Sequence, residues 1–197
     1  MEQEKELGEE LESARAECDA ISKEFQVIKN KRFEAFMKTF DAVTSNIDPI
    51  YKELTGGSTR GGSMGGTAYL SLENPDEPYL AGIKYTAMPP TKRFRDMTDL
   101  SGGEKTVAAL ALLFAINLSS PGEAEFFVLD EIDAALDSTN VSRVAKFLRG
   151  RSSQFQTIVI SLKDTFYDKA DCLHGVTRNP ETGFSNSFTL DLKAFAA

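Results

Sequence analysis

The sequence predicts an α/β fold: a parallel sheet flanked by helices, with a terminal β-hairpin and a long N-terminal helix. Two apolar runs, residues 126–129 and 157–160, have the length and continuity of parallel strands that are covered on both faces. An amphipathic segment at residues 138–148 separates them, which gives the strand–helix–strand order of a right-handed βαβ unit. A seven-residue apolar repeat near the N-terminus predicts the long helix.

Composition fits one globular domain with an extension. The chain has 197 residues, of which 41% are hydrophobic and 26% charged, enough for one sizeable core. Its 22 basic and 30 acidic residues give a net charge of −8, which argues against binding DNA or an anionic membrane over the whole surface. Cys18 and Cys172 lack metal-ligand spacing, so a reducing compartment fits best. No signal peptide, transit peptide or membrane-length apolar run is present, and we expect no membrane partner.

Residues 1–47 are predicted to form a coiled-coil arm helix that enters a globular lobe, residues 48–197. Apolar positions alternate in steps of four and three, at Leu7, Leu11, Ala14, Cys18, Ile21, Phe25 and Ile28, between charged flanks. No second segment has matching heptads, so a partner strand is expected from elsewhere. A chain that begins inside such a seam is expected to be a piece of a longer one. The alternative is a single amphipathic helix lying on the domain.

The arm is followed by a break and a glycine-rich loop. Asp48 before Pro49 predicts a new helix start, with residues 50–54 as the body and Gly56-Gly57 as its stop. Residues 56–66 predict a loop, and a phosphate-binding role is disfavoured because no Lys-Ser or Lys-Thr pair follows.

Several shorter elements complete the lobe. Strands are expected at residues 68–72 and 82–87, and a helix buried on most sides at residues 107–118, closed by Pro121-Gly122. The basic run Thr91-Lys92-Arg93-Phe94-Arg95 is by default a solvated loop, with contact to DNA phosphates as the alternative. A short helix at residues 166–170 precedes strands at 173–176 and 187–192, which pair as an antiparallel hairpin through a turn at 179–183.

Two motifs carry chemistry. Ser101-Gly102-Gly103 opens a helix, where a hydroxyl, exposed backbone N–H groups and the positive helix end can hold an anion such as a γ-phosphate. Asp130 and Glu131 follow an apolar strand. If a magnesium nucleotide lies against them, Asp130 can hold a water of the Mg²⁺ shell and Glu131 can orient and deprotonate the attacking water. The alternatives are an ordinary glycine turn and an ordinary acidic loop.

The sequence contains no GxxxxGK(S/T) loop to wrap the remaining phosphates of ATP. The two motifs therefore supply only part of a nucleotide site, and any ATP chemistry must be shared with another polypeptide.

The motifs resemble those of a known superfamily. Residues 100–105 are similar to the signature motif of ABC-type ATPases, and residues 126–137 resemble their Walker B strand and D-loop. Glu104 and Ile132-Asp133 stand where transporter ATPases usually have glutamine and Pro-Thr, and the heptad arm also suits the SMC proteins. Residues 99–116, 126–137 and 158–163 look like the C-terminal half of the cohesin SMC subunit that binds the kleisin C-terminal winged-helix domain.

This resemblance implies the C-terminal lobe of an SMC ATPase head, acting on chromosomes in the nucleus. An N-terminal Walker A half would complete a site for ATP and Mg²⁺, served in cis by Asp130 and Glu131, and the isolated half would be inactive. A second SMC subunit would form a heterodimer, with its ATP contacted in trans by the signature residues, namely Ser101, Gly102, Gly103, Glu104 and Lys105. Asp137, at the D-loop position, would lie across the same interface. Cycles of ATP binding and hydrolysis would drive the tethering of sister chromatids, with DNA bound through the assembled complex.

One position departs from the pattern. Leu162 stands where many ABC ATPases have a histidine that senses the γ-phosphate, and leucine can neither donate a hydrogen bond nor relay a proton. Hydrolysis is therefore expected to be slow or to depend more fully on Glu131. His174, in the terminal hairpin, is expected to be structural or at the surface.

Two other functions remain open from the sequence. The lobe can be mainly a kleisin-docking module that uses Phe184, Phe188 and Leu190, although these residues would look the same if they belonged to the core. A Rad50-like DNA repair ATPase is the other alternative, and the leucine at the histidine position counts against it.

Overall fold

The structure, a computed structural model, describes residues 2–56, 64–90, 97–119 and 126–195. It divides into two compact units: one holds the chain up to Ala42 with Leu70–Lys84, and the other holds Val43–Tyr69 with the chain from Tyr85 onwards. Most of the expected glycine-rich loop, the basic run at 91–95 and the Pro121-Gly122 stop lie outside the described residues.

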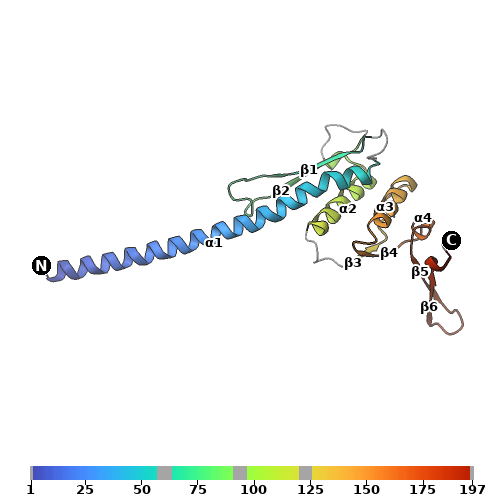
Figure 1. The fold of residues 1–197 in the computed structure, drawn as a ribbon. Coiled ribbons are helices and arrows are strands. Elements are labelled where there is room, and N and C mark those ends of the chain that lie inside the picture. The colour runs from blue at the N-terminus through green and yellow to red at the C-terminus, as the bar shows by residue number, and fades with distance from the viewer. Residues whose placement is uncertain (1, 57–63, 91–96, 120–125, 196–197) are drawn as a thin grey trace. The chain divides into compact units, whose positions relative to one another are not determined.

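The first helix, α1, spans Glu2–Leu54 without a break (Figure 1), so the expected new helix start at Asp48-Pro49 was wrong. The Asp48 carboxylate accepts a hydrogen bond from the backbone N–H of Ala68, at 3.1 Å, and caps no helix. Pro49 lies inside the helix, where a proline costs about 3 kcal/mol. This cost is offset by the burial of four neighbouring side chains, Ile47, Ile50, Tyr51 and Leu54.

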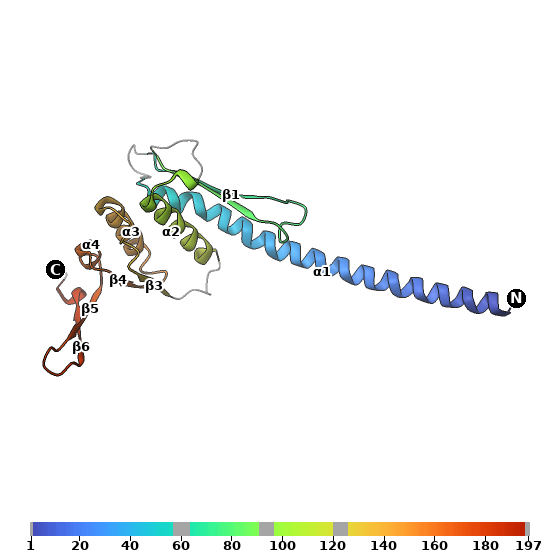
Figure 2. The same cartoon turned by 180° about the vertical axis from the view of Figure 1, so that it is seen from behind.

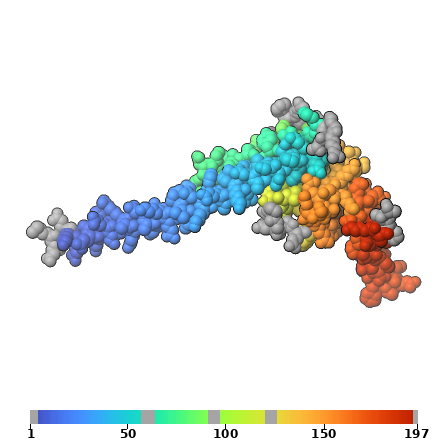
Figure 3. All heavy atoms as spheres, in the orientation of Figure 1, coloured from blue at the N-terminus to red at the C-terminus, as the bar shows by residue number. Residues whose placement is uncertain are grey.

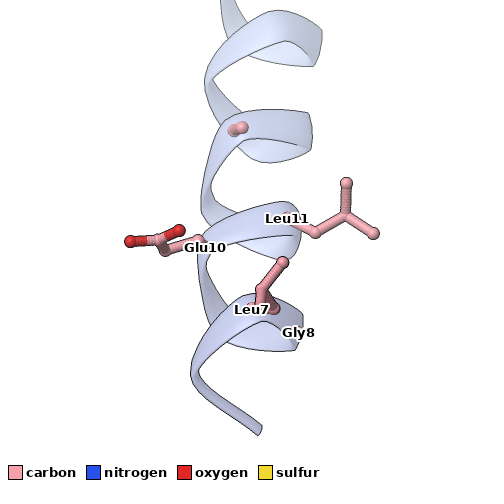
Figure 4. Close-up of a pocket in the computed structure, with 5 residues that line it drawn as sticks. Leu7, Gly8, Glu10 and Leu11 are labelled. Atoms are coloured by element: carbon pink, nitrogen blue, oxygen red, sulfur yellow. The ribbon is translucent and has the colours of Figure 1, made fainter. Parts of the chain in front are cut away.

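In the first unit the apolar seam of the arm is open to solvent. Leu7, Leu11 and Phe25 are 69%, 53% and 66% exposed. Figure 4 shows Leu7 and Leu11 on successive turns, while Glu10 projects away from Leu11. An apolar seam in this state is available to a second helix, as the heptad pattern predicts.

The segment Leu70–Lys84 of the same unit is tied to the arm by two contacts. Lys29 forms an ion pair with Glu77 at 2.6 Å, which raises the pKa of the lysine, and the Arg32 guanidinium lies 3.8 Å from the centre of the Tyr79 ring. Lys29 and Arg32 are three residues apart, which places them on adjacent turns of one face of α1.

Helices α2, Gly102–Leu118, and α3, Ser138–Gly150, form the centre of the second unit and lie side by side in both views (Figure 2). Their core is aromatic: the Phe114 ring is 4.8 Å from that of Phe147 and 5.5 Å from that of Phe127. The expectation that α2 is buried on most sides holds for one face only, because Leu113 and Ile116 are exposed.

Within the described residues, the strands form three two-stranded sheets. Strands β1, Thr67–Leu72, and β2, Ile83–Met88, form the first. Strands β3, Phe126–Asp130, and β4, Gln156–Ile160, pair directly in parallel. Helix α3 connects them in the sequence, which confirms the expected strand–helix–strand order. The short helix expected at residues 166–170 lies earlier, as α4, Asp164–Tyr167. It leads to the antiparallel hairpin of β5, Cys172–Arg178, and β6, Ser185–Asp191, a pairing that confirms the expected hairpin.

The expected burial of both faces of the parallel sheet was wrong. Phe127 and Leu129 are buried, whereas Phe126 and Val128 are 60% and 55% exposed. In β4, Ile158, which pairs with Val128, and Ile160 are also exposed. Strands with apolar residues on both faces normally lie inside a protein, so this face lacks a covering layer within the part of the chain that the structure describes. We define Phe126, Val128, Ile158 and Ile160 as the open sheet face.

Candidate functional site

The two candidate carboxylates lie where β3 ends. Asp130 is its last residue, and Glu131 then adopts a φ of 47°, in the left-handed region that side chains other than glycine seldom adopt. The backbone N–H of Glu131 donates to the carbonyl of Ile160 at 2.9 Å, which fixes this turn to the end of β4. Side chains along β3 point alternately to the two faces of the sheet, and this turn ends that pattern directly after Asp130.

Both carboxylates are available to a ligand. Asp130 and Glu131 are exposed, and neither side chain makes an ion pair or hydrogen bond to another described residue. An exposed carboxylate at a strand end fits Mg²⁺, which usually takes one or two protein carboxylates and keeps water and phosphate oxygens as its other ligands. Among the described residues, no cluster of three or more His, Cys, Asp or Glu side chains could hold a metal by itself.

The signature residues open α2 as the sequence predicted. Ser101 is the N-cap: its Oγ accepts from the N–H of Glu104 at 3.4 Å, and Glu104 Oε2 accepts from the N–H of Ser101 at 2.7 Å. These reciprocal bonds form a capping box, which satisfies two N–H groups at the helix start. Lys105 Nζ donates to the carbonyl of Thr98 at 3.0 Å and so ties the first turn to the preceding segment.

Gly103, in the segment that resembles a signature motif, lies against the turn that precedes Asp137. A Cβ atom at Gly103 would lie 2.9 Å from the carbonyl oxygen of Ala135, closer than real Cβ contacts allow, whereas one at Gly102 would meet nothing within 4 Å. Asp137 follows this turn and caps α3 by accepting from the N–H of Asn140 at 2.8 Å. The fold therefore places Gly103 beside the turn between Glu131 and Asp137.

Two tyrosines, the buried Tyr51 and the half-buried Tyr85, lie near the first turns of α2. Burial, helped by the charge of Glu104, raises the pKa of Tyr51 to about 12. Burial also raises the pKa of Tyr85, whose hydroxyl donates to the carbonyl of Ala108 at 3.0 Å. Both phenols stay neutral well above pH 7 and add no negative charge beside the start of α2.

Sequence reasoning missed a polar group beside Glu131. Asp133 is only 4% exposed and accepts a hydrogen bond from Ser161 Oγ at 2.8 Å. Lys163 Nζ donates to the carbonyl of Leu136 at 3.2 Å. These partners are 28 and 27 residues apart in the chain, so no local pattern could pair them.

A pocket opens beside this polar group. It is lined by Glu131, Asp133, Ala134, Leu162, Lys163, Asp164 and Thr165. Leu162, at the position expected to hold a histidine, is 89% exposed at its rim. The structure thus brings the strand-end carboxylate Glu131 and the residue at the histidine position to the same pocket.

The terminal hairpin carries apolar side chains on its surface. Phe184, Phe188 and Leu190 are 74%, 61% and 46% exposed, so they are not core residues, and Figure 3 shows the hairpin standing out from the rest of its unit. His174 also lies here, at the surface as expected, with Nδ1 2.9 Å from Thr189 Oγ1.

Comparison with known proteins gives consistent matches. The model of the family described as RecF/RecN/SMC N terminal domain matches residues 2–184. Structural maintenance of chromosomes protein 1 of Arabidopsis thaliana is 56% identical over 181 residues, covering 85% of this chain and 14% of that protein. The chain therefore spans about one seventh of the length of this relative. None of the described helices is both long and apolar enough to span a membrane.

Solved structures show the same fold. The Smc head domain with an extended coiled coil, bound to the C-terminal domain of ScpA and derived from Pyrococcus furiosus, has a TM-score of 0.80 at 36% identity. That match covers 96% of this chain and 45% of the other. A structure described under ATP-driven dimerization and DNA stimulated activation of SMC ATPases has a TM-score of 0.68 at 37% identity, covering 82% of this chain and 91% of the other.

Proposed function

This chain belongs to the RecF/RecN/SMC N-terminal domain family, and we propose that it is the C-terminal half of the ATPase head of a cohesin SMC subunit. The observation that carries the proposal is the position of Asp130 and Glu131 at the end of β3, a strand with exposed apolar side chains on one face. The similarity to structural maintenance of chromosomes protein 1 supports the cohesin subunit, and with it action on chromosomes in the nucleus. In this proposal residues 1–47 are the arm and residues 48–197 the lobe.

The open sheet face is the proposed docking surface for the N-terminal Walker A half. Its four apolar side chains project from β3 and β4, the strands that carry Asp130 and lead to Leu162. Covering them removes apolar surface from water and places a phosphate-binding loop near Asp130 and Glu131. The chain alone would then be inactive, because it lacks the residues that wrap the nucleotide.

Within the completed site, Glu131 would orient the attacking water and accept its proton, and Asp130 would hold a water of the Mg²⁺ shell. The bound magnesium ion supplies charge neutralisation at the phosphate oxygens. The left-handed backbone at Glu131, tied to Ile160, limits the positions that its carboxylate can reach. Because Leu162 can accept no proton, Glu131 is the proposed catalytic base.

The signature would contact ATP on a second SMC subunit. The capped N-terminus of α2 presents the Ser101 hydroxyl and the N–H groups of Gly102 and Gly103 to an anion. Asp137 would approach the same interface from the start of α3. Two ATP molecules would then lie between two heads, so that binding engages the heads and hydrolysis releases them.

The terminal hairpin is the proposed docking site for the kleisin C-terminal winged-helix domain, and the assembled complex would bind DNA. The exposure of Phe184, Phe188 and Leu190 supports docking over a core role, and the similar Smc head of Pyrococcus furiosus is bound to the C-terminal domain of ScpA. Phe188→Ala is expected to weaken binding of a kleisin winged-helix domain at least 10-fold, which titration calorimetry measures. Unchanged affinity would exclude the hairpin.

The ATPase proposal is tested with Glu131→Gln in the full-length protein paired with its partner subunit. The variant keeps the side chain's size and removes the base, so we expect ATP to bind and the heads to stay engaged while turnover falls by at least 100-fold. Glu34→Gln, the same change at an exposed position of α1, is the matched control and should turn over ATP normally. Normal turnover in Glu131→Gln would overturn the proposal.

A further inference from the structure

Two hydrogen bonds join the loop after β4 to the loop after β3. Ser161 Oγ donates to Asp133 Oδ2 at 2.8 Å, and Lys163 Nζ donates to the carbonyl of Leu136 at 3.2 Å. We call this pair of bonds the loop brace. It holds the turn that begins at Glu131 and ends before Asp137.

The turn itself is compact. The N–H of Ala134 donates to the carbonyl of Glu131 at 3.2 Å, and that of Leu136 donates to the carbonyl of Asp133 at 3.1 Å. The loop brace therefore binds this turn at Asp133, near its middle, and at Leu136, near its end. The hydrogen bond from the N–H of Glu131 to the carbonyl of Ile160 holds its start. Movement of the β4 loop would move Glu131 and the D-loop position together.

Asp133 is the buried acceptor of the loop brace. Among the described residues it is the one buried charged side chain, 4% exposed, and a buried carboxylate needs hydrogen-bond donors. The Ser161 hydroxyl donates to it, and Ser161 Oγ in turn accepts from the N–H of Lys163 at 2.9 Å. The carbonyl of Ser161 accepts in turn from the Tyr167 hydroxyl, which anchors the loop to α4.

We propose that Asp133, Ser161 and Lys163 are positioning residues that hold Glu131 for hydrolysis and Asp137 for the partner head, an inference that rests on the proposed ATPase function. None of the three touches the reacting atoms in this role. With leucine at position 162, the loop after β4 offers no imidazole to the γ-phosphate. Its contribution is the geometry that the brace imposes on the neighbouring loop.

A positioning role makes a kinetic prediction. Loss of the Ser161 hydroxyl leaves Asp133 without that donor and frees the turn, so Glu131 is held less accurately while the nucleotide contacts stay intact. In the full-length heterodimer, Ser161→Ala should lower kcat by about 10- to 100-fold with a change of less than about 3-fold in KM for ATP. Ser161→Thr keeps the hydroxyl and should restore at least half of the lost rate.

The second contact gives an independent test. Lys163→Met keeps the length of the side chain and removes the donor to Leu136, and we expect kcat to fall about 10-fold. Lys163→Arg should retain most of the activity because it keeps a donor. Matched controls are Ser153→Ala, in the exposed turn after α3, and Lys146→Met, on the exposed face of α3, which should both leave turnover unchanged.

A double variant separates the brace from unrelated effects. If the Ser161–Asp133 bond is what matters, Ser161→Ala combined with Asp133→Asn should lower kcat no further than the worse single variant. If the double variant loses as much kcat as the product of the two single losses, the inference is overturned. It is also overturned if Ser161→Ala changes KM and kcat by equal factors and lowers the melting temperature. Should Ser161→Ala not fold, the Lys163 pair decides: equal turnover of Lys163→Met and the parent overturns the inference.

The parent complex and Glu131→Gln are measured alongside. If the parent hydrolyses ATP, Glu131→Gln abolishes turnover and the brace variants behave as the parent does, the positioning inference alone fails. If Glu131→Gln leaves turnover intact, the proposed function fails and takes the inference with it.

Discussion

The guanidinium of Arg151 donates two hydrogen bonds to the carboxylate of Glu53, at 3.1 and 2.8 Å, across 98 residues of sequence. It also lies 3.7 Å from the centre of the Phe147 ring, so one side chain combines a bidentate ion pair with a cation–π contact. Arg151 follows the C-terminus of α3, whose N-cap is Asp137, and Glu53 lies in the last turn of α1. This contact therefore fastens α3 to the end of the arm helix within the second unit.

Arg151→Ala should lower the free energy of unfolding by about 1 kcal/mol, because the pair is partly exposed and such pairs contribute modestly. Denaturant unfolding of the chain measures the loss, and the ion-pair share of it should shrink in 1 M salt. Lys146→Ala, an exposed change on α3, is the control and should stay within about 0.5 kcal/mol of the parent. Equal losses in the two variants would show that the contact with Glu53 adds nothing.

Pro49→Ala should stabilise the chain. Pro49 is exposed inside α1, where it removes a backbone hydrogen bond, and alanine restores the donor without disturbing the buried neighbours Ile47 and Ile50. Greater freedom of the unfolded chain offsets part of the gain, so we expect a net increase of about 1 to 2 kcal/mol. The same unfolding experiment tests this, with Lys38→Ala on the exposed side of α1 as the control. A less stable Pro49→Ala variant would mean that the proline fits the helix without cost.

Local patterns predicted the elements whose signals lie within one segment. The strand–helix–strand order around α3, the capped start of α2 at Ser101 and the terminal hairpin are all present. The helix break at Pro49 was wrong because burial of distant partners overrides a local stop signal, and nothing local reports those partners. The pairing of Asp133 with Ser161 was missed for the same reason, since contacts between loops depend on the tertiary fold.

The open sheet face shows a different limit. The apolar runs in β3 and β4 correctly indicated strands, but the expected burial of both faces was wrong, because the described residues cover only the face with Phe127 and Leu129. An apolar sequence pattern indicates that burial is favourable, but it cannot say which segment or polypeptide would provide each covering layer.

Gly103→Ala should be destabilising where Gly102→Ala is not. The new methyl group at Gly103 would lie 2.9 Å from the carbonyl oxygen of Ala135, so α2 or the turn must shift, at a cost of about 1 to 3 kcal/mol. Gly102 has open space around it, and alanine favours a helix there, so that variant should be as stable as the parent or more so. Melting temperatures of the two variants measure the difference, and equal values would show that the turn yields freely.

The open sheet face makes the last prediction, in a chain mixed with the N-terminal Walker A half of the same protein. Val128→Thr with Ile158→Thr changes two paired, exposed residues, so the lobe alone should lose less than about 1 kcal/mol of stability. Association with the other half should weaken at least 10-fold, because two hydroxyl groups would be buried without partners at about 1 to 3 kcal/mol each. Val176→Thr makes the same change at an exposed site of the terminal hairpin and should leave association unchanged, as measured by calorimetry. If the double variant binds the other half as tightly as the parent does, the covering layer lies elsewhere and the half-head architecture proposed for this chain loses its main structural support.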